Sequence, residues 1–200
     1  MSLDRHLRFL VWYKDPVRFF KDIYKLDPFP YQARILRDLT NYDIKRMHLM
    51  GAGGTGKTKL LGAIALYYVP VLAYFKGKME VIIISGSEDQ AKHLYNYTLE
   101  AIEDNPELGD LVDGEPRITL TKFKDRSVIR ALARSMKKIQ GKHGDLVIVD
   151  EAILVGDHFL KDTLRIVNDN EYSRIIFSGT PVPSYMVKGC LLYTSPSPRD

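Results

Sequence analysis

GAGGTGKT, residues 51–58, is the stretch that decides the fold. It fits the pattern G-x-x-x-x-G-K-[ST], in which glycine backbone amides wrap phosphates, the lysine reaches the β and γ oxygens, and the last hydroxyl meets Mg²⁺. Its surroundings agree, because the strand-like MHLM (47–50) precedes it and the helix-like TKLLGAIALYY (58–68) follows. A glycine-rich surface turn would need neither neighbour. The residues expected to hold ATP are therefore Gly51, Gly53, Gly54, Thr55, Gly56, Lys57 and Thr58, with Thr58 also a ligand of Mg²⁺.

The composition bounds the class of protein. The chain has 200 residues, of which 45% are apolar and 27% charged, enough for one domain with a core. Its net charge of +4 is compatible with nucleic acid, although exposed lysines alone give the same balance. Residues 1–16 are charged throughout, unlike a secretory signal. The apolar run Leu60–Phe75 is shorter than the roughly 20 residues of a membrane span and contains Pro70, so we expect a buried helix and no membrane.

The last residues, CLLYTSPSPRD (190–200), differ from everything before them. They can be a Ser/Pro-rich linker, but the string also corresponds to the translation of a sequencing-library adapter, the interpretation we favour. The native sequence then stops near Gly189, the chain is a fragment, and Cys190, its only cysteine, is not native. A chain without cysteine has no disulfide framework, which fits an intracellular setting. We expect three parts: an N-terminal helical segment (1–45), a core (46–189) and a non-native tail (190–200).

Short apolar runs alternate with helical periodicity after a helix-rich segment at residues 3–41. Such runs are typical of parallel strands buried on both faces. Strands are predicted at 47–50, 81–85, 146–150 and 174–178, and helices at 57–68, 88–103 and 157–167. ITLTKF (118–123) and SVIRALA (127–133), joined by KDR, predict an antiparallel hairpin added to the sheet. The whole pattern predicts an α/β fold with a mostly parallel sheet flanked by helices, and ligands at the carboxyl ends of the strands.

LVIVDEA (146–152) places two carboxylates, Asp150 and Glu151, at the end of a buried strand. Phosphoryl transfer from ATP needs a metal that neutralises charge and a group that positions the attacking water. Asp150 suits the first role, through a water on Mg²⁺, and Glu151 suits the second as general base. The alternative, an acidic pair at a helix N-terminus, is less favoured after a phosphate loop. Lys57, Asp150 and Glu151 are the predicted catalytic residues, and Thr58 and Asp150 the predicted metal ligands.

Two further stretches are candidate nucleotide contacts. SGTP (178–181) ends the last strand, where Ser178, Gly179 and Thr180 are candidates to sense the γ-phosphate; these are also ordinary turn residues. DPFPYQ (27–32) places Gln32 at a helix start. Its amide offers one donor and one acceptor to the edge of adenine, with Tyr31 packed nearby. The alternative is a surface glutamine on an amphipathic helix.

VIIISGSEDQA (81–91) is a candidate polynucleotide contact. Ser85, Ser87 and Gln90 can meet phosphate oxygens at a helix start, or Ser87 and Gln90 can form a plain capping box. The basic loop ARSMKKIQGKHGD (133–145) can contact DNA or a neighbouring subunit, or be a solvated charge run. We predict no zinc site, because the following histidines have no metal-like spacing: His93, His143 and His158.

The ordered set YQ, GAGGTGKT, VIIISGSEDQA, IQGKHGDLVIVDEA and SGTP resembles the ATPase domain of viral large terminase subunits, from bacteriophages and archaeal viruses, over residues 15–183. The resemblance implies a RecA-like P-loop NTPase of the ASCE class that uses ATP and Mg²⁺ to move double-stranded DNA into a procapsid. It implies a homo-oligomeric ring in the host cytoplasm, at the procapsid portal, with portal protein and small terminase subunit as partners. It also implies roles for Gln32 at adenine, Lys57 and Thr58 at phosphates and Mg²⁺, Asp150 and Glu151 at metal and water, and Ser178 to Thr180 in coupling.

The sequence departs from this family in two ways. GAGGTGKT lacks the arginine that many terminases carry in the phosphate loop, so a neighbouring subunit's arginine is a candidate charge stabiliser; Arg130, Arg134 and Arg174 are the guesses for it. The nuclease domain that normally follows is absent, so no nuclease residues are assigned. Two alternatives remain. One is a helicase of the two-RecA-domain class, disfavoured by VDEA, SGTP and the hairpin; the other is a nucleotide-binding regulatory module without turnover.

Overall fold

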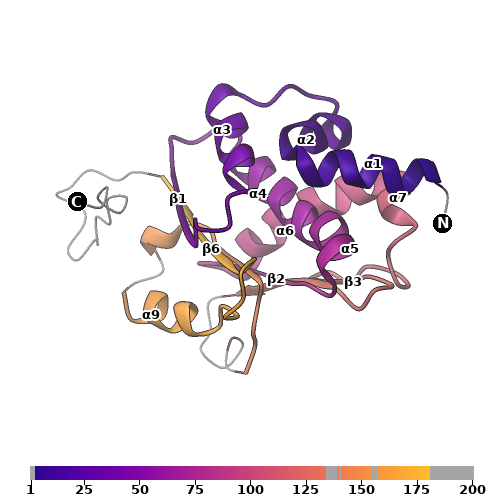
Figure 1. Cartoon of the computed structure of the whole chain (residues 1–200). Coiled ribbons are helices and arrows are strands. Elements are labelled where there is room, and N and C mark those ends of the chain that lie inside the picture. Colours follow the sequence, from indigo (N-terminus) through magenta and orange to yellow (C-terminus); the bar gives the residue numbers. More distant parts are fainter. Residues whose placement is uncertain (1–2, 134–138, 140, 155–156, 181–200) are drawn as a thin grey trace.

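The computed structural model describes residues 3–133, 139, 141–154 and 157–180. Its helices and strands alternate after three N-terminal helices (Figure 1). In chain order the elements are α1 (Leu3–Lys14), α2 (Pro16–Tyr24), α3 (Pro30–Asp38), β1 (Arg46–Met50), α4 (Lys57–Leu66), the π-helical segment η1 (Tyr67–Leu72), α5 (Ala73–Lys76), β2 (Glu80–Ser85), α6 (Glu88–Glu103), α7 (Pro106–Gly109), β3 (Leu120–Lys122), β4 (Val128–Ala133), β5 (Leu146–Val149), the 3₁₀ turn η2 (Ala152–Leu154), α9 (Asp157–Arg165) and β6 (Arg174–Gly179).

The six strands form one sheet in the order β1-β6-β5-β2-β4-β3. Every neighbouring pair is parallel except β3 and β4, which are antiparallel. The predicted α/β fold of the P-loop NTPase type, with its mostly parallel sheet and added hairpin, is therefore confirmed. Runs such as EVIIIS become central strands because both of their faces can be buried under helices.

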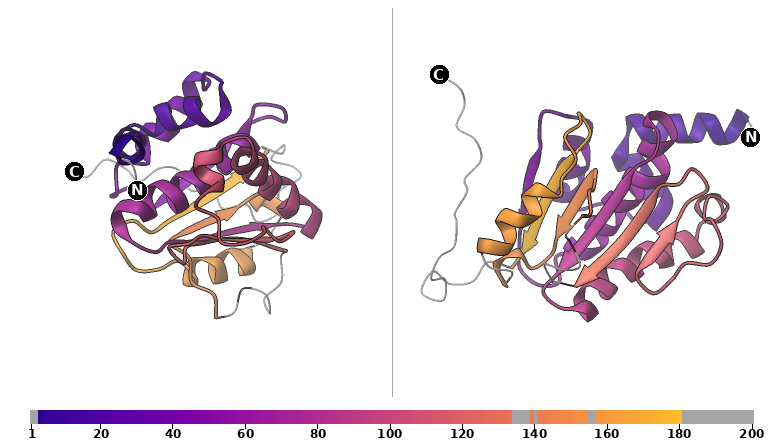
Figure 2. Two further views of the ribbon diagram at one scale, coloured as in Figure 1. Left: turned by 90° about the vertical axis from the view of Figure 1, so that its right-hand side faces the viewer. Right: turned by 90° about the horizontal axis from the view of Figure 1, so that it is seen from below.

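Two apolar clusters hold the helices against the two faces of the sheet. On one face, Val81 and Ile83 of β2 pack in the same cluster as Leu61 of α4 and Leu94 of α6. On the other face, β-strand side chains pack against a smaller cluster that includes Phe159 of α9. Figure 2 shows this layering in its left view, with the N-terminal helices above the sheet and α9 below it. Alternation along each strand decides which side chain joins which cluster.

The helix behind the phosphate loop covers the whole apolar run Leu60–Phe75, which confirms the expected buried helix, and it is longer than the helix predicted at 57–68. It runs from Lys57 to Lys76 through α4, η1 and α5, instead of ending near Tyr68. Pro70 lies inside it and has no backbone N–H, and the π-helical turn accommodates the missing bond. By length and composition this is the one helix, among the residues described, that could cross a membrane; 78% of its most apolar stretch is buried inside the protein, as in core helices.

The N-terminal helices pack on the same face as α4. Asp15 caps α2, because its carboxylate accepts hydrogen bonds from the backbone amides of Val17 (3.0 Å) and Arg18 (3.1 Å). Phe9 and Phe19 are fully buried and join the larger apolar cluster. Helix α3 is anchored through Leu36, which is also fully buried. This anchoring fixes the first turn of α3 beside the phosphate loop.

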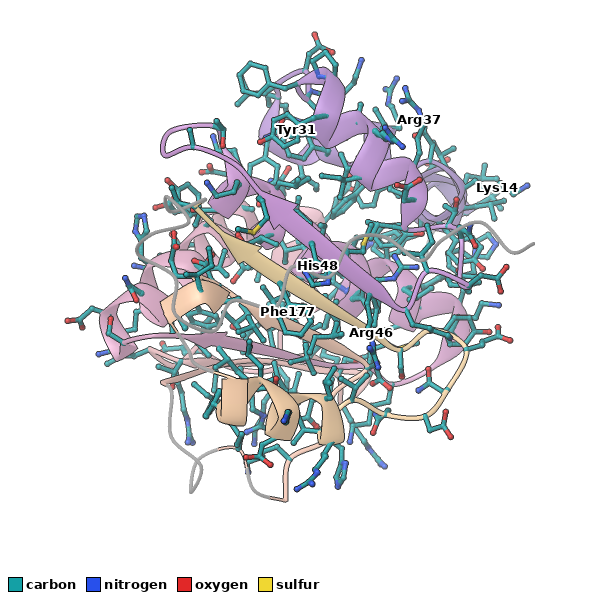
Figure 3. The ribbon with its side chains drawn as sticks, turned by 90° about the vertical axis from the view of Figure 1, so that its left-hand side faces the viewer. Lys14, Tyr31, Arg37, Arg46, His48 and Phe177 are labelled. Atoms are coloured by element: carbon teal, nitrogen blue, oxygen red, sulfur yellow. The ribbon has the colours of Figure 1, made fainter. Side chains whose placement is uncertain are left out.

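Strand β1 leads directly into that loop and lies at one edge of the sheet. Its side chains alternate, with Met47 and Leu49 in the core and Arg46 and His48 exposed. The His48 ring stacks on Phe177 of the neighbouring strand β6, with ring centroids 5.2 Å apart (Figure 3). Partial burial, and secondarily the Arg46 charge, lowers the pKa of His48. His48 therefore stays neutral more readily than a free histidine.

Candidate nucleotide site

Three predicted motifs meet at the carboxyl edge of the sheet. β1 pairs with β6 so that Met50 lies beside Gly179, and β5 pairs with β6 so that Val149 lies beside Phe177. The amide of Gly51 donates to the carbonyl of Gly179 over 3.2 Å. The phosphate loop, the DEA turn and the SGT turn are therefore neighbours in space, although the phosphate loop is far from the other two turns in sequence.

The phosphate loop has the backbone that its glycines allow. Gly54 and Gly56 have φ of +74° and +81°, the left-handed region that disfavours other residues. Lys57 begins α4, and its ammonium group donates to the carbonyls of Gly51 (2.6 Å) and Ala52 (2.8 Å). Lys57 thus lies across the loop it belongs to, within reach of any phosphate bound there. A backbone cradle with one lysine at its mouth fits a triphosphate.

Asp150 stands immediately after β5, one residue beyond the end of the strand. Burial raises the pKa of its carboxyl; the Ser178 hydroxyl, the backbone of Glu151 and the Lys57 charge partly offset this effect. The fully buried Ser178 Oγ nevertheless makes no hydrogen bond of good geometry within the described chain. Asp150 therefore lies within electrostatic reach of Lys57, at a position where an arriving cation would compensate its buried charge.

Glu151 is held in an uncommon conformation. Its φ is +48°, a region that residues other than glycine rarely occupy and that is often found at functional sites. Its carboxylate accepts a hydrogen bond from the backbone amide of Thr180 (3.3 Å) and a long one from the Thr180 hydroxyl (3.5 Å). The predicted general base and the predicted coupling motif are thus in direct contact.

Gln32 lies beside the loop, but its amide is already engaged. Its Oε1 accepts from the backbone amide of Phe29 (2.9 Å), and its Nε2 donates to the carbonyl of Gly56 (3.1 Å). The side chain is buried, with 4% exposed. The preceding Tyr31 donates its hydroxyl to the carbonyl of Thr55 (2.5 Å). The exposed ring of Phe29 stacks on the ring of Tyr31, with the ring centroids 6.5 Å apart.

Some of the candidate polynucleotide contacts lie at the N-terminus of α6, and others lie outside the described residues. Ser87 caps α6 by accepting from the amide of Gln90 (3.2 Å), which confirms the helix cap and leaves the full capping box with Gln90 a prediction. Ser85 is buried and donates to the Gln90 side chain at 3.4 Å. Residues 134–138 and 140 of the basic loop 133–145, Arg134 among them, lie outside the described residues. Where the structure describes the chain, no three His, Cys, Asp or Glu side chains gather as metal ligands would.

Arg174 is not available as an arginine finger, which corrects that expectation. It opens β6 with 1% of its surface exposed. Its guanidinium donates to the carbonyls of Ile44 and Asn41, each at 2.7 Å, just beyond the end of α3. A side chain buried this way cannot reach a neighbouring subunit. Arg130 is paired with Glu80 at 2.7 Å in a partly buried contact, so it too is engaged within its own chain.

The buried carboxylate of Asp145 is the hub of a hydrogen-bond network that the sequence does not predict. Asp145, at the start of β5, accepts from the amide of Glu80 (2.8 Å) and from the side chains of Asn168 (2.7 Å) and Asn170 (2.8 Å). It lies at the amino end of the strands, opposite the candidate site. Nothing in the letters GD before LVIV distinguishes it, because its partners are distant in sequence.

The sheet order, the glycine loop and the adjacent acidic turn define an α/β P-loop NTPase domain. The chain belongs to the AAA domain family, whose pattern it matches over residues 29–182. No curated protein matches it by sequence.

Solved structures share the fold. The large terminase of bacteriophage HK97 superposes with a TM-score of 0.70 at 19% identity, covering 84% of this chain and 37% of that one. The large terminase ATPase domain of Thermus phage P74-26 gives 0.63 at 17% identity, with 84% and 70% covered. A large terminase from a thermophilic bacteriophage, solved in complex with ADP, gives 0.51 at 12% identity, with 83% and 38% covered. The chain thus has the fold of phage large terminase ATPase domains and spans about a third of the full HK97 protein.

Proposed function

We propose that this domain hydrolyses ATP with Mg²⁺ and is the motor part of a viral DNA-packaging terminase. One observation carries the proposal: Lys57, which follows the loop after β1, and the pair Asp150 and Glu151, which follow β5, lie at the same edge of the sheet on either side of β6, with Glu151 bonded to Thr180. That constellation supplies a phosphate-binding cation, a metal-holding carboxylate and a water-positioning carboxylate in one place. A surface turn that happened to be rich in glycine would have no such partners.

The residues divide the chemistry between them. Lys57 leaves the carbonyls of Gly51 and Ala52 and donates to phosphate oxygens when ATP enters. Thr58 and Asp150 would hold Mg²⁺, and the ion would supply positive charge that offsets the charge of the phosphates. Asp150 acts in its ionised form, and a nearby cation favours that form because it compensates the cost of burial. Backbone amides of the loop hold the remaining phosphate oxygens.

Glu151 orients the attacking water and takes its proton. It has to leave or share its contact with Thr180 to do so, since the carboxylate already accepts from that residue. Motion of the SGT turn and alignment of the general base are therefore linked. This linkage supports a coupling role for Ser178, Gly179 and Thr180: the first two end β6 and pair with β1, and Thr180 follows them and contacts Glu151 beyond the end of β5.

ATP turnover by purified variants tests the chemistry. Lys57→Ala should abolish Mg²⁺-dependent hydrolysis and weaken nucleotide binding, whereas Glu151→Gln should abolish hydrolysis and leave binding intact. Lys161→Ala, on an exposed position of α9, serves as a matched control for loss of a lysine. Undiminished hydrolysis by Glu151→Gln would contradict the role given to Glu151.

The packaging role extends to partners. The terminase fold supports double-stranded DNA, a portal protein and a small terminase subunit as partners, with action as a homo-oligomeric ring at the procapsid portal in the host cytoplasm. The test is ATP-dependent protection of DNA from nuclease by the full-length protein together with procapsids. Strand separation of a duplex without procapsids would instead identify a helicase.

A further inference from the structure

Two consecutive residues of α3 hold two consecutive carbonyls of the phosphate loop. The hydroxyl of Tyr31 donates to Thr55 over 2.5 Å, and the amide of Gln32 donates to Gly56 over 3.1 Å. Both donors lie in the first turn of α3, which Leu36 anchors in the core. The last part of the loop is thus tied sideways to a fixed helix as well as along the chain to β1 and α4.

The Gln32 side chain is committed to this contact. Its oxygen is held by the amide of Phe29, its nitrogen by Gly56, and 4% of its surface is exposed. Reading an adenine edge needs a donor and an acceptor presented side by side to the base. Here each group is already bonded to backbone, so one N–H and one oxygen lone pair of the amide are all that is left for a base.

The clamp helps to set which way the loop amides point, together with α4, whose Leu60 amide also donates to the Gly56 carbonyl over 3.1 Å. In a planar trans peptide, the C=O of one residue and the N–H of the next face opposite directions. Drawing the carbonyls of Thr55 and Gly56 toward α3 therefore turns the amides of Gly56 and Lys57 away from α3. The backbone at Gly56 is tightly packed against this contact: its φ is +81°, and a Cβ added there would lie 2.9 Å from Gln32 Nε2. Amides that converge in this way form an anion-binding concavity.

We propose that Tyr31 and Gln32 are a positioning clamp for the phosphate loop, so that Gln32 sets the affinity for the polyphosphate whichever base is attached. This inference rests on the proposed nucleotide site. It predicts that breaking the clamp weakens ATP, GTP and base-free tripolyphosphate alike. A base-reading glutamine would act on ATP alone.

The variants separate the clamp from its surroundings. Gln32→Met keeps the buried volume and removes both amide bonds, and Tyr31→Phe keeps the ring stacked on Phe29 and removes only the hydroxyl bond. Phe29→Ala is the matched control, since it removes an exposed ring and leaves the backbone amide that Gln32 accepts from. Calorimetric titration with ATP, GTP and tripolyphosphate, each with Mg²⁺, measures the affinities of variants whose thermal stability equals that of the parent.

Each clamp variant should bind all three probes about five-fold more weakly, the effect of losing one backbone hydrogen bond. Phe29→Ala should bind tripolyphosphate as the parent does. A loss confined to ATP would overturn the clamp and assign Gln32 to adenine. Amide hydrogen exchange without ligand gives an independent readout: exchange at Gly56, Lys57 and Thr58 should be faster in Gln32→Met, and unchanged exchange would also overturn the clamp. If the parent chain binds no probe, the proposed function fails, while exchange still decides the clamp.

Discussion

Replacing Arg174 with methionine should destabilise the fold without touching the chemistry. The guanidinium makes two short bonds, to the carbonyls of Ile44 and Asn41 at 2.7 Å, and a longer one to Leu39 at 3.5 Å. These carbonyls lie at and beyond the end of α3, where the helix dipole favours a cation. A hydrogen bond from a charged donor contributes about 1.5–3 kcal/mol. Removing the buried charge recovers part of that, because its desolvation cost also disappears.

The expected net loss for Arg174→Met is about 3 kcal/mol of unfolding free energy. Urea unfolding followed by the fluorescence of Trp12, which is buried and is the single tryptophan, measures it. With a urea slope of about 2 kcal/mol/M, the midpoint should fall by about 1.5 M. Arg165→Met is the control: that side chain is 80% exposed and pairs with Asp162 at the surface, so its midpoint should barely move.

The opposite result would refute the reasoning. If Arg174→Met unfolds at the parent midpoint and yet loses ATP turnover, Arg174 has a functional role that its buried position does not account for. Folded but inactive protein is the outcome expected of an arginine finger and not of a helix clamp.

Three more perturbations bear on the site. Thr180→Val removes the hydroxyl that faces Glu151, and it should lower the turnover number for ATP about three-fold without changing the dissociation constant of ATP. Steady-state kinetics and titration measure the two quantities, and a turnover number equal to the parent's would contradict the coupling contact. Asp150→Asn should abolish hydrolysis yet raise stability at neutral pH. The folded-state pKa of Asp150 is raised, so ionisation of this carboxyl costs stability as the pH rises from the ordinary carboxyl pKa through the raised one. Below that pH range the unfolding midpoints of the two proteins should converge. Gly56→Ala should lose about 1–2 kcal/mol in urea unfolding because φ is +81° and the added methyl meets Gln32, whereas Gly53→Ala, with open space at its Cβ, should unfold like the parent.

Local patterns were sufficient for the sheet and its helices. Apolar runs with acidic or glycine ends predicted β1, β2, β5 and β6 within a residue or two, and the break at KDR predicted the hairpin of β3 and β4. The order of motifs also placed the phosphate loop and the DEA turn at one edge. These features depend on residues close together in sequence or on the rule that parallel strands end at a common edge.

The features that the sequence does not predict depend on contacts between residues that are far apart in the chain. The buried helix through Pro70 is predicted from its apolar residues, but the π-helical turn that accommodates the proline is not. Arg174 at the start of a strand reads as exposed, and the carbonyls that bury it are more than a hundred residues earlier. The residue types around Gln32 predict an adenine contact, and they give no sign of its hydrogen bond to the Gly56 carbonyl. Tertiary contacts of this kind leave no periodic trace in a single sequence.

The hub at Asp145 has a mechanical consequence. One carboxylate joins the beginning of β2 to the connection that leads into β6, and the carbonyl of the same residue accepts from the amide of Arg174 at 2.8 Å. The sheet is thereby cross-linked at its amino end, while the contacts of Glu151 at the opposite end are 3.3 Å and longer. A movement that begins at the triphosphate would then displace the turns at one rim and leave the strands in register, so the sheet is the stationary part of the machine.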